Sequence, residues 1–166
     1  MSDKTILTIG IIAHVDAGKT SITESLLHYS GATTALGSVD KGSAITDDLA
    51  MEQRRGISIK SSFVNFSWNN TLFQLVDTPG HIDFAAEVDR SLSILDAVIL
   101  VVSAKEGVQA HTINLWESLV ERKLPVLIFF NKIDRDGVDI ESVFLDFQKD
   151  LGAKLFALNY PDLSIP

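Results

Sequence analysis

Residues 5–20 read TILTIGIIAHVDAGKT, and this stretch decides the fold. Residues 5–12 are almost all apolar and rich in β-branched side chains, as expected of a strand that is buried on both faces of a sheet. Small residues follow at 13–20, and residues 21–29 then place apolar side chains at helical spacing. The stretch therefore predicts a buried strand, a tight loop and a helix in succession.

The rest of the chain continues this alternation of apolar runs and helical periodicity, which is typical of a mostly parallel sheet covered by helices on both faces. Asn69 and Asn70 tolerate positive φ and separate two strand-like runs, which predicts a β-hairpin with one antiparallel strand at an edge. We therefore predict a three-layer α/β domain with a mixed, mostly parallel sheet. The six expected strands are 5–12, 57–68, 71–77, 97–102, 124–130 and 154–158, and the expected helices are 21–29, 84–95, 109–121 and 139–151.

The composition excludes several classes of protein. The 166 residues carry 14 Lys+Arg against 22 Asp+Glu, a formal net charge of −8, which argues against a general basic surface for nucleic acid. Without cysteine the chain has neither a disulfide framework nor a thiolate metal site, and the cytosol is the default compartment. The longest apolar runs, 97–102 and 124–130, are too short to cross a bilayer, and no signal peptide is evident. We expect a cytoplasmic monomer without membrane contact.

The loop after the first strand is the first candidate site. Residues 13–20 match the phosphate-binding pattern G-x-x-x-x-G-K-[ST], except that Ala13 replaces the first glycine. Backbone N–H groups here would point at phosphate oxygens, Lys19 would supply a cation for the β- and γ-phosphates, and Thr20 would offer a hydroxyl to Mg²⁺. A tight turn that ends in a helix cap is the alternative interpretation. The residues expected to bind phosphates are Asp16, Ala17, Gly18, Lys19, Thr20 and Ser21.

The second candidate element is D-T-P-G-H at 77–81, directly after an expected strand. Asp77 lies where that strand ends, so its carboxylate is placed to hold Mg²⁺ through water. Gly80 has a bare backbone that is able to turn its N–H toward a γ-phosphate. An ordinary turn is the alternative, because D-T-P-G has strong turn chemistry.

The third candidate element, N-K-I-D at 131–134, indicates which nucleotide base the site binds. Asp134 is able to accept paired hydrogen bonds from N1 and the 2-amino group of guanine, whereas adenine would leave this carboxylate unpaired. Asn131 is expected to bond either to the base edge or to the phosphate loop, and the stem of Lys132 to lie over the ring. Taken alone, the motif is also compatible with a solvated charged turn. Together the three elements predict a guanine-nucleotide site where the loops ending three neighbouring strands meet.

Four motifs, A-H-V-D-A-G-K-T, R-G-I-S-I, D-T-P-G-H-I-D-F and N-K-I-D, together resemble the GTPase domain of translational GTPases of the elongation factor G kind. Segments 36–42, 87–96 and 103–110 are more narrowly similar to the ribosomal-protection tetracycline-resistance proteins. The resemblance covers most of the chain. It implies the P-loop NTPase fold of a G domain, binding of GTP and GDP with Mg²⁺, hydrolysis of GTP, and the ribosome as partner.

The resemblance also implies roles in catalysis. His81 matches the histidine that orients the attacking water once the ribosome positions it, and Lys19 is the second expected catalytic residue. Because such an imidazole needs a partner to fix it, we expect slow hydrolysis without the ribosome. Val15 and Ile57 match two apolar residues that screen the γ-phosphate, although burial in the core would explain them equally well.

Two further positions concern metal ions. Ser58 stands where the family usually has a threonine that binds Mg²⁺; serine keeps the hydroxyl and the backbone N–H. Asp16 matches a position associated with a monovalent cation, with solvation as its alternative. The family's last guanine-binding element has no match after Leu151, so we expect 1–158 to be a G domain that ends before this element, and 159–166 a tail.

Other functions remain open at this point. A P-loop ATPase or kinase would use Lys19 and Asp77 but has no role for N-K-I-D. A non-catalytic GTP-dependent binding module would be expected to lack His81 or Lys19, and both are present. Within the translational GTPases, an elongation factor G or release-factor type of domain is the alternative to the resistance type.

Overall fold

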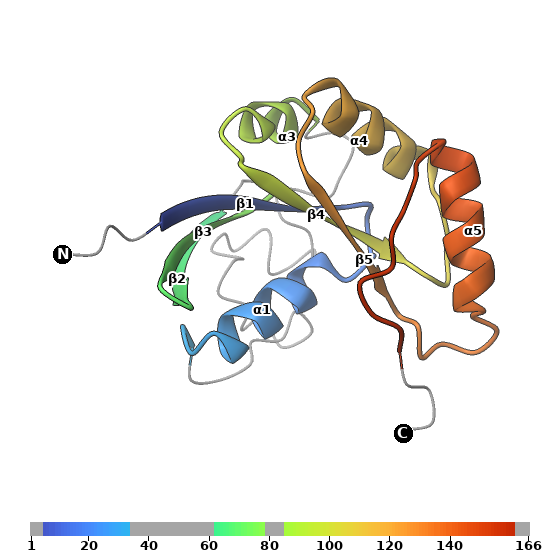
Figure 1. Ribbon diagram of the computed structural model, residues 1–166, viewed down its shortest axis with the longest axis horizontal. Helices are drawn as coiled ribbons and strands as arrows, with labels where there is room; N and C mark the ends of the chain where they lie inside the picture. Colours follow the sequence, from blue (N-terminus) through green and yellow to red (C-terminus); the bar gives the residue numbers. More distant parts are fainter. Residues whose placement is uncertain (1–4, 34–61, 79–84, 162–166) are drawn as a thin grey trace.

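The computed structural model describes residues 5–33, 62–78 and 85–161, and Figure 1 shows how their elements are arranged. One sheet runs through the domain in the order β2-β3-β1-β4-β5. All neighbouring strands are parallel except β2 and β3, which form the antiparallel hairpin at one edge. The elements are β1 (Thr5–Ala13), α1 (Lys19–Tyr29), β2 (Ser62–Trp68), β3 (Thr71–Asp77), α3 (Ala85–Leu92), β4 (Ala97–Ser103), α4 (Ala110–Glu121), β5 (Val126–Asn131) and α5 (Ile140–Leu151).

The predicted hairpin and the antiparallel edge strand are confirmed. Asn69 and Asn70 have φ values of 44° and 63°, so both turn residues are left-handed, as a two-residue type I′ turn requires. The register that follows pairs Ser62 with Asp77 at the open end of the hairpin. The hairpin therefore fixes where β3 ends, and with it the position of Asp77.

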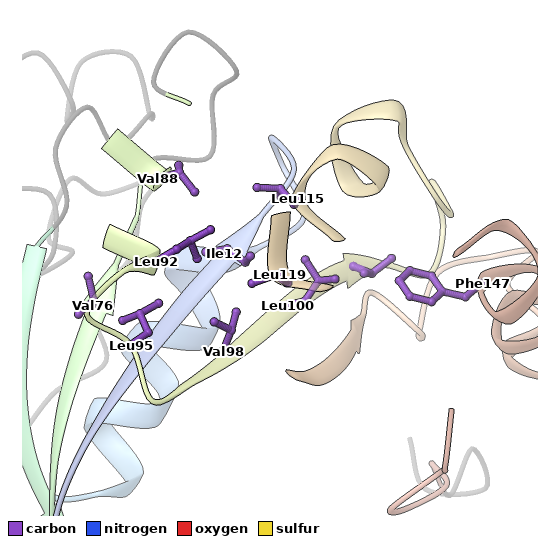
Figure 2. Close-up of a cluster of buried hydrophobic side chains, with 11 residues drawn as sticks. Ile12, Val76, Val88, Leu92, Leu95, Val98, Leu100, Leu115, Leu119 and Phe147 are labelled. Atoms are coloured by element: carbon purple, nitrogen blue, oxygen red, sulfur yellow. The ribbon is translucent and has the colours of Figure 1, made fainter. Parts of the chain in front are cut away.

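Helices cover both faces of the sheet, as predicted. Alternate side chains of β1 enter two separate cores: Ile12 joins the core under α3, α4 and α5, whereas Ile11 packs with Leu27 of α1. Figure 1 shows α1 on the opposite side of the sheet from α3 and α4. Figure 2 shows the first core, in which Phe147 of α5 packs at the end of a continuous apolar layer. The domain is therefore a three-layer α/β structure.

The predicted strand at 154–158 is wrong. These residues are within the described part of the chain but pair with no strand there, so the described sheet has five strands and not six. Leu155 packs against the core, and its carbonyl accepts a 3.4 Å hydrogen bond from the Gln148 side chain, while Phe156 is 86% exposed. A short apolar run makes a strand only where a neighbouring strand completes its hydrogen bonds.

The helix boundaries follow local capping chemistry. Asp139 is the N-cap of α5, and its carboxylate accepts a 3.1 Å hydrogen bond from the backbone N–H of Glu141. Gly152 ends the same helix with φ 59°. In the described ranges, no helix combines the length and the apolar character needed to span a membrane.

Candidate functional site

The carboxyl ends of β1, β3 and β5 carry the three candidate elements. β1 and β3 are neighbours, and their register places Ile11 opposite Asp77. The expectation of three neighbouring strands is wrong, however, because β4 lies between β1 and β5. A side chain nevertheless connects the ends of β5 and β1: Nδ2 of Asn131 donates a 2.8 Å hydrogen bond to the carbonyl oxygen of Ala17, in the loop after β1. Of the two contacts expected for Asn131, the structure shows the one to the loop after β1.

The loop after β1 has a backbone that suits its sequence. Asp16 and Gly18 both have positive φ, at 62° and 92°, and Ala17 between them is fully buried. A Cβ atom at position 18 would clash with Nδ2 of Asn131. Glycine is therefore needed both for its left-handed φ and for the close approach of Asn131 at the end of β5. The position of the Asn131 side chain thus requires a residue without a Cβ atom at position 18.

The loop leads directly into α1, whose first turn offers backbone donors. Gly18 is the N-cap residue, and no side chain in the described structure caps this helix. The backbone N–H of Ile22 bonds to the carbonyl of Gly18 at 3.1 Å, whereas the N–H groups of 19–21 precede the first intrahelical bond. Such an N-terminus is suited to bind an anion, because its donors and the helix dipole both favour negative charge.

Lys19 and Asp77 form a buried ion pair at the junction of this loop and β3. Their side chains are only 7% and 2% exposed, and Nζ of Lys19 is in direct contact with Oδ1 of Asp77. Thr78 strengthens the junction, since its hydroxyl donates a 3.0 Å hydrogen bond to the carbonyl of Ile11. The structure therefore brings together the residue expected to bind phosphates and the one expected to hold Mg²⁺.

The loop after β5, residues 132–139 and called the β5 loop below, carries the residues predicted to bind the base. Lys132 has φ 57°, and its Nζ lies 3.2 Å from Oε1 of Glu106. Asp134 is exposed, so its carboxylate is open to a ligand. Thr20 is half-buried and Ser21 is exposed at the start of α1.

The structure does not describe four of the predicted residues and shows a fifth, Val15, to be partly exposed. Ile57, Ser58, Gly80 and His81 lie outside the described residues. Val15 is 42% exposed, which excludes burial in the core as its explanation and leaves the screening role as a prediction.

Sequence reasoning missed Glu106, which follows β4. Its carboxylate contacts Lys132 and also lies 3.8 Å from Nε2 of His14, in the loop after β1. A hydrogen bond from the Ser103 side chain, followed by the contacts with Lys132, lowers the pKa of Glu106, whereas burial lowers the pKa of His14. The sequence offered no signal for these contacts, because 92 positions separate His14 from Glu106.

Comparisons with known proteins show the family to which the chain belongs. The family model for the elongation factor Tu GTP binding domain matches residues 4–160. The chain is 52% identical over 150 residues to tetracycline resistance protein TetM of Ureaplasma urealyticum, which covers 90% of the chain and 24% of that protein. It is 50% identical over 155 residues to tetracycline resistance protein TetP of Clostridium perfringens, covering 93% of the chain and 24% of that protein.

A solved structure gives the same result for the fold. A crystal structure of a Thermus thermophilus protein superposes with a TM-score of 0.84 at 30% identity, covering 90% of this chain and 22% of that one. The chain thus spans about a quarter of the length of the curated relatives it matches. The sequence match and the shared architecture together show that this chain belongs to the family of the elongation factor Tu GTP binding domain.

Proposed function

We propose that this chain binds GTP and GDP and hydrolyses GTP as the G domain of a ribosome-dependent translation factor. The relatives named above, tetracycline resistance proteins TetM and TetP, favour the ribosomal-protection type over an elongation factor G or release-factor type. The observation that carries the nucleotide site is the hydrogen bond from Asn131 to Ala17, because it brings the proposed base-binding loop onto the proposed phosphate loop. The protein would act in the cytoplasm with the ribosome as its partner.

The chain's own residues would bind the triphosphate. The N–H groups of the first turn of α1 would donate to phosphate oxygens, and Lys19 would exchange its carboxylate partner, Asp77, for the phosphates. The site fits Mg²⁺, since that ion is commonly held by one or two side-chain ligands plus substrate phosphates, and Thr20 and Asp77 flank the loop. When bound, Mg²⁺ would neutralise negative charge that develops on the phosphate oxygens. Asp16 would lie near any monovalent cation.

The base would be selected at the β5 loop. Asp134 would accept hydrogen bonds from N1 and the 2-amino group of guanine, and Lys132 would lie against the ring. Hydrolysis is proposed to depend on His81, which would orient the attacking water, and on Ser58, which would join the metal ligands. Both roles rest on the family resemblance, and the 42% exposure of Val15 is consistent with a residue that faces a ligand and not the core.

The base assignment is tested by exchanging the recognised group. Asp134→Asn should weaken binding of GDP and gain affinity for xanthosine diphosphate, because the amide offers a donor where xanthine has a carbonyl. Equilibrium titration of the intact protein with both nucleotides, with and without Mg²⁺, measures this change. A preference for guanine that Asp134→Asn leaves unaltered would contradict the assignment, and displacement of GDP by ADP at equal concentration would favour an ATPase.

The catalytic proposal needs a separate measurement. GTP turnover of the intact protein should be slow alone and should rise when ribosomes are added. His81→Ala should remove most of that rise while leaving GDP affinity close to wild type. Equal rates with and without ribosomes would overturn the proposed dependence on the ribosome.

A further inference from the structure

The side chain of Glu106 joins two loops that the sheet keeps apart. Glu106 follows β4, the strand that separates β1 from β5. Its Oε1 lies 3.2 Å from Nζ of Lys132 in the β5 loop, and its Oε2 lies 3.8 Å from Nε2 of His14 in the loop after β1. One carboxylate therefore reaches both loops from between them.

The backbone of Glu106 is held in place by the end of β4. Its N–H donates a 3.4 Å hydrogen bond to the hydroxyl of Ser103, and the N–H of Gly107 bonds to the carbonyl of Ser103 at 2.9 Å. Ser103 itself is fully buried at the end of a core strand. The backbone that carries the carboxylate is thus anchored to the end of a core strand, although the side chains of Glu106 and Lys132 are themselves 41% and 24% exposed.

The two contacts differ in kind. The pKa of Glu106 is lowered by Ser103 and Lys132, so the carboxylate is charged near neutral pH and pairs with the Lys132 ammonium. Burial lowers the pKa of His14, so its ring is neutral there and presents a polar edge. The Thr112 hydroxyl lies 3.3 Å from Nδ1; when it donates to that atom, the ring hydrogen sits on Nε2 and faces Glu106. In the described structure Nε2 has no hydrogen-bond partner, so Glu106 faces the ring at 3.8 Å without a hydrogen bond, and Thr112 is the residue that holds it.

We propose that Glu106 is a positioning residue for nucleotide binding: its ion pair holds the Lys132 ammonium, and with it the loop after β5, facing His14 of the phosphate loop. This inference rests on the proposed nucleotide site. Asn131 already joins the loops through Ala17, and the charge-assisted pair of Glu106 with Lys132 adds a connection from the end of β4 to the loop after β5. A mere surface ion pair would change nucleotide affinity little.

The test is a double-mutant cycle on the intact protein, with the dissociation constant for GDP as its readout. Glu106→Gln removes the charge and keeps the size, and Lys132→Met removes the ammonium but keeps the apolar stem. Because the pair is partly exposed, we expect each single change to weaken GDP binding about five-fold and the double change to weaken it little further. For Glu106→Gln the effect on GTP turnover should lie in a raised KM, with kcat close to wild type, since Glu106 is not proposed to touch the reacting phosphate.

The matched control is Glu121→Gln, which removes the same charge from a side chain that is 82% exposed at the end of α4. It should leave the affinity for GDP as in wild type. Glu106→Asp, which keeps the charge on a shorter stem, should recover part of the affinity and also serves in the cycle if Glu106→Gln fails to fold.

Two results would overturn the inference alone: a Glu106→Gln affinity equal to that of Glu121→Gln, or single-mutant effects that multiply in the double mutant. If the unaltered protein failed to bind GDP, the proposed function would fall, and the inference with it.

Discussion

The side-chain amide of Asn131 donates a 2.8 Å hydrogen bond to the backbone carbonyl of Ala17, which lies 114 residues earlier in the chain. The contact crosses β4 and ties the end of β5 to the loop that opens α1. Because Ala17 is fully buried, its carbonyl has little access to water if this donor is lost. The stability of the domain and the arrangement of the proposed site therefore depend on the same bond.

Asn131→Ala should destabilise the domain by about 1–3 kcal/mol, since it leaves a buried carbonyl without its donor. The same change should weaken GDP binding, because the β5 loop is released from the phosphate loop. Urea unfolding without nucleotide and titration with GDP measure the two effects. Asn114→Ala, on the exposed face of α4, is the control and should change neither. Unaltered stability of Asn131→Ala would show that the bond contributes nothing.

Gly18→Ala should be more damaging than the same substitution at Gly137. Both glycines have positive φ, 92° and 80°, so alanine is strained at each by about 1–2 kcal/mol. A Cβ at Gly137 meets nothing within 4 Å, whereas at Gly18 it clashes with the Asn131 side chain, which should add about 1–3 kcal/mol.

Thermal unfolding of the two variants measures the difference. Adding Asn131→Ala to Gly18→Ala should cost less than Asn131→Ala costs in wild type, because the clash disappears with the amide. Equal losses for the two glycine variants would refute the close approach as the reason for Gly18.

Asp77→Asn should lower the free energy of unfolding, and it should also reduce the effect of Mg²⁺ on GDP affinity. It leaves the buried Lys19 ammonium without its carboxylate, and breaking such a pair from one side costs about 3–5 kcal/mol. Lys19→Met combined with Asp77→Asn should recover part of this loss, since no buried charge then remains unpaired.

The metal effect is measured as the ratio of GDP affinities with Mg²⁺ and with EDTA. That ratio should be clearly smaller for Asp77→Asn than for wild type, because a proposed ligand of the ion is lost. A ratio that matches wild type would contradict the metal role of Asp77 while leaving its structural role intact.

The contribution of Glu106 to stability should depend on pH. Its pKa in the folded protein is lowered from 4.5, first by the hydrogen bond from Ser103 and further by Lys132, so the unfolded chain binds the proton more tightly. The carboxylate therefore stabilises the fold above about pH 4.5, and this stabilisation is lost as the pH falls through the lower folded pKa.

The measurement is the urea midpoint of wild type minus that of Glu106→Gln across this pH range. The difference should be positive near neutral pH and should shrink on acidification; it should be smaller throughout in a Lys132→Met background, where the ammonium is gone and the hydrogen bond from Ser103 remains. A difference that grows as the pH falls would have the wrong sign for a lowered pKa.

Local pattern was sufficient for most of the architecture. The apolar run of β1, the glycine that follows it and the helical spacing of α1 predicted a strand, a loop and a helix, and Asn69-Asn70 predicted the hairpin. These features depend on sterics and burial over a few residues, which the sequence displays directly. The run 154–158 shows the limit of this reasoning, because it was predicted as a strand but no strand of the described sheet pairs with it.

The motifs likewise predicted Lys19, Asp77 and Asn131 as site residues from their places after strands. Only the tertiary structure decided that β4 lies between β1 and β5, that Asn131 crosses it to reach Ala17, and that Glu106 pairs with Lys132 and faces His14. Strand order is determined by how whole faces of the sheet are buried against helices, and it brings together residues about a hundred positions apart. Periodicity and spacing determine which elements form, whereas packing of the complete chain decides which side chains meet.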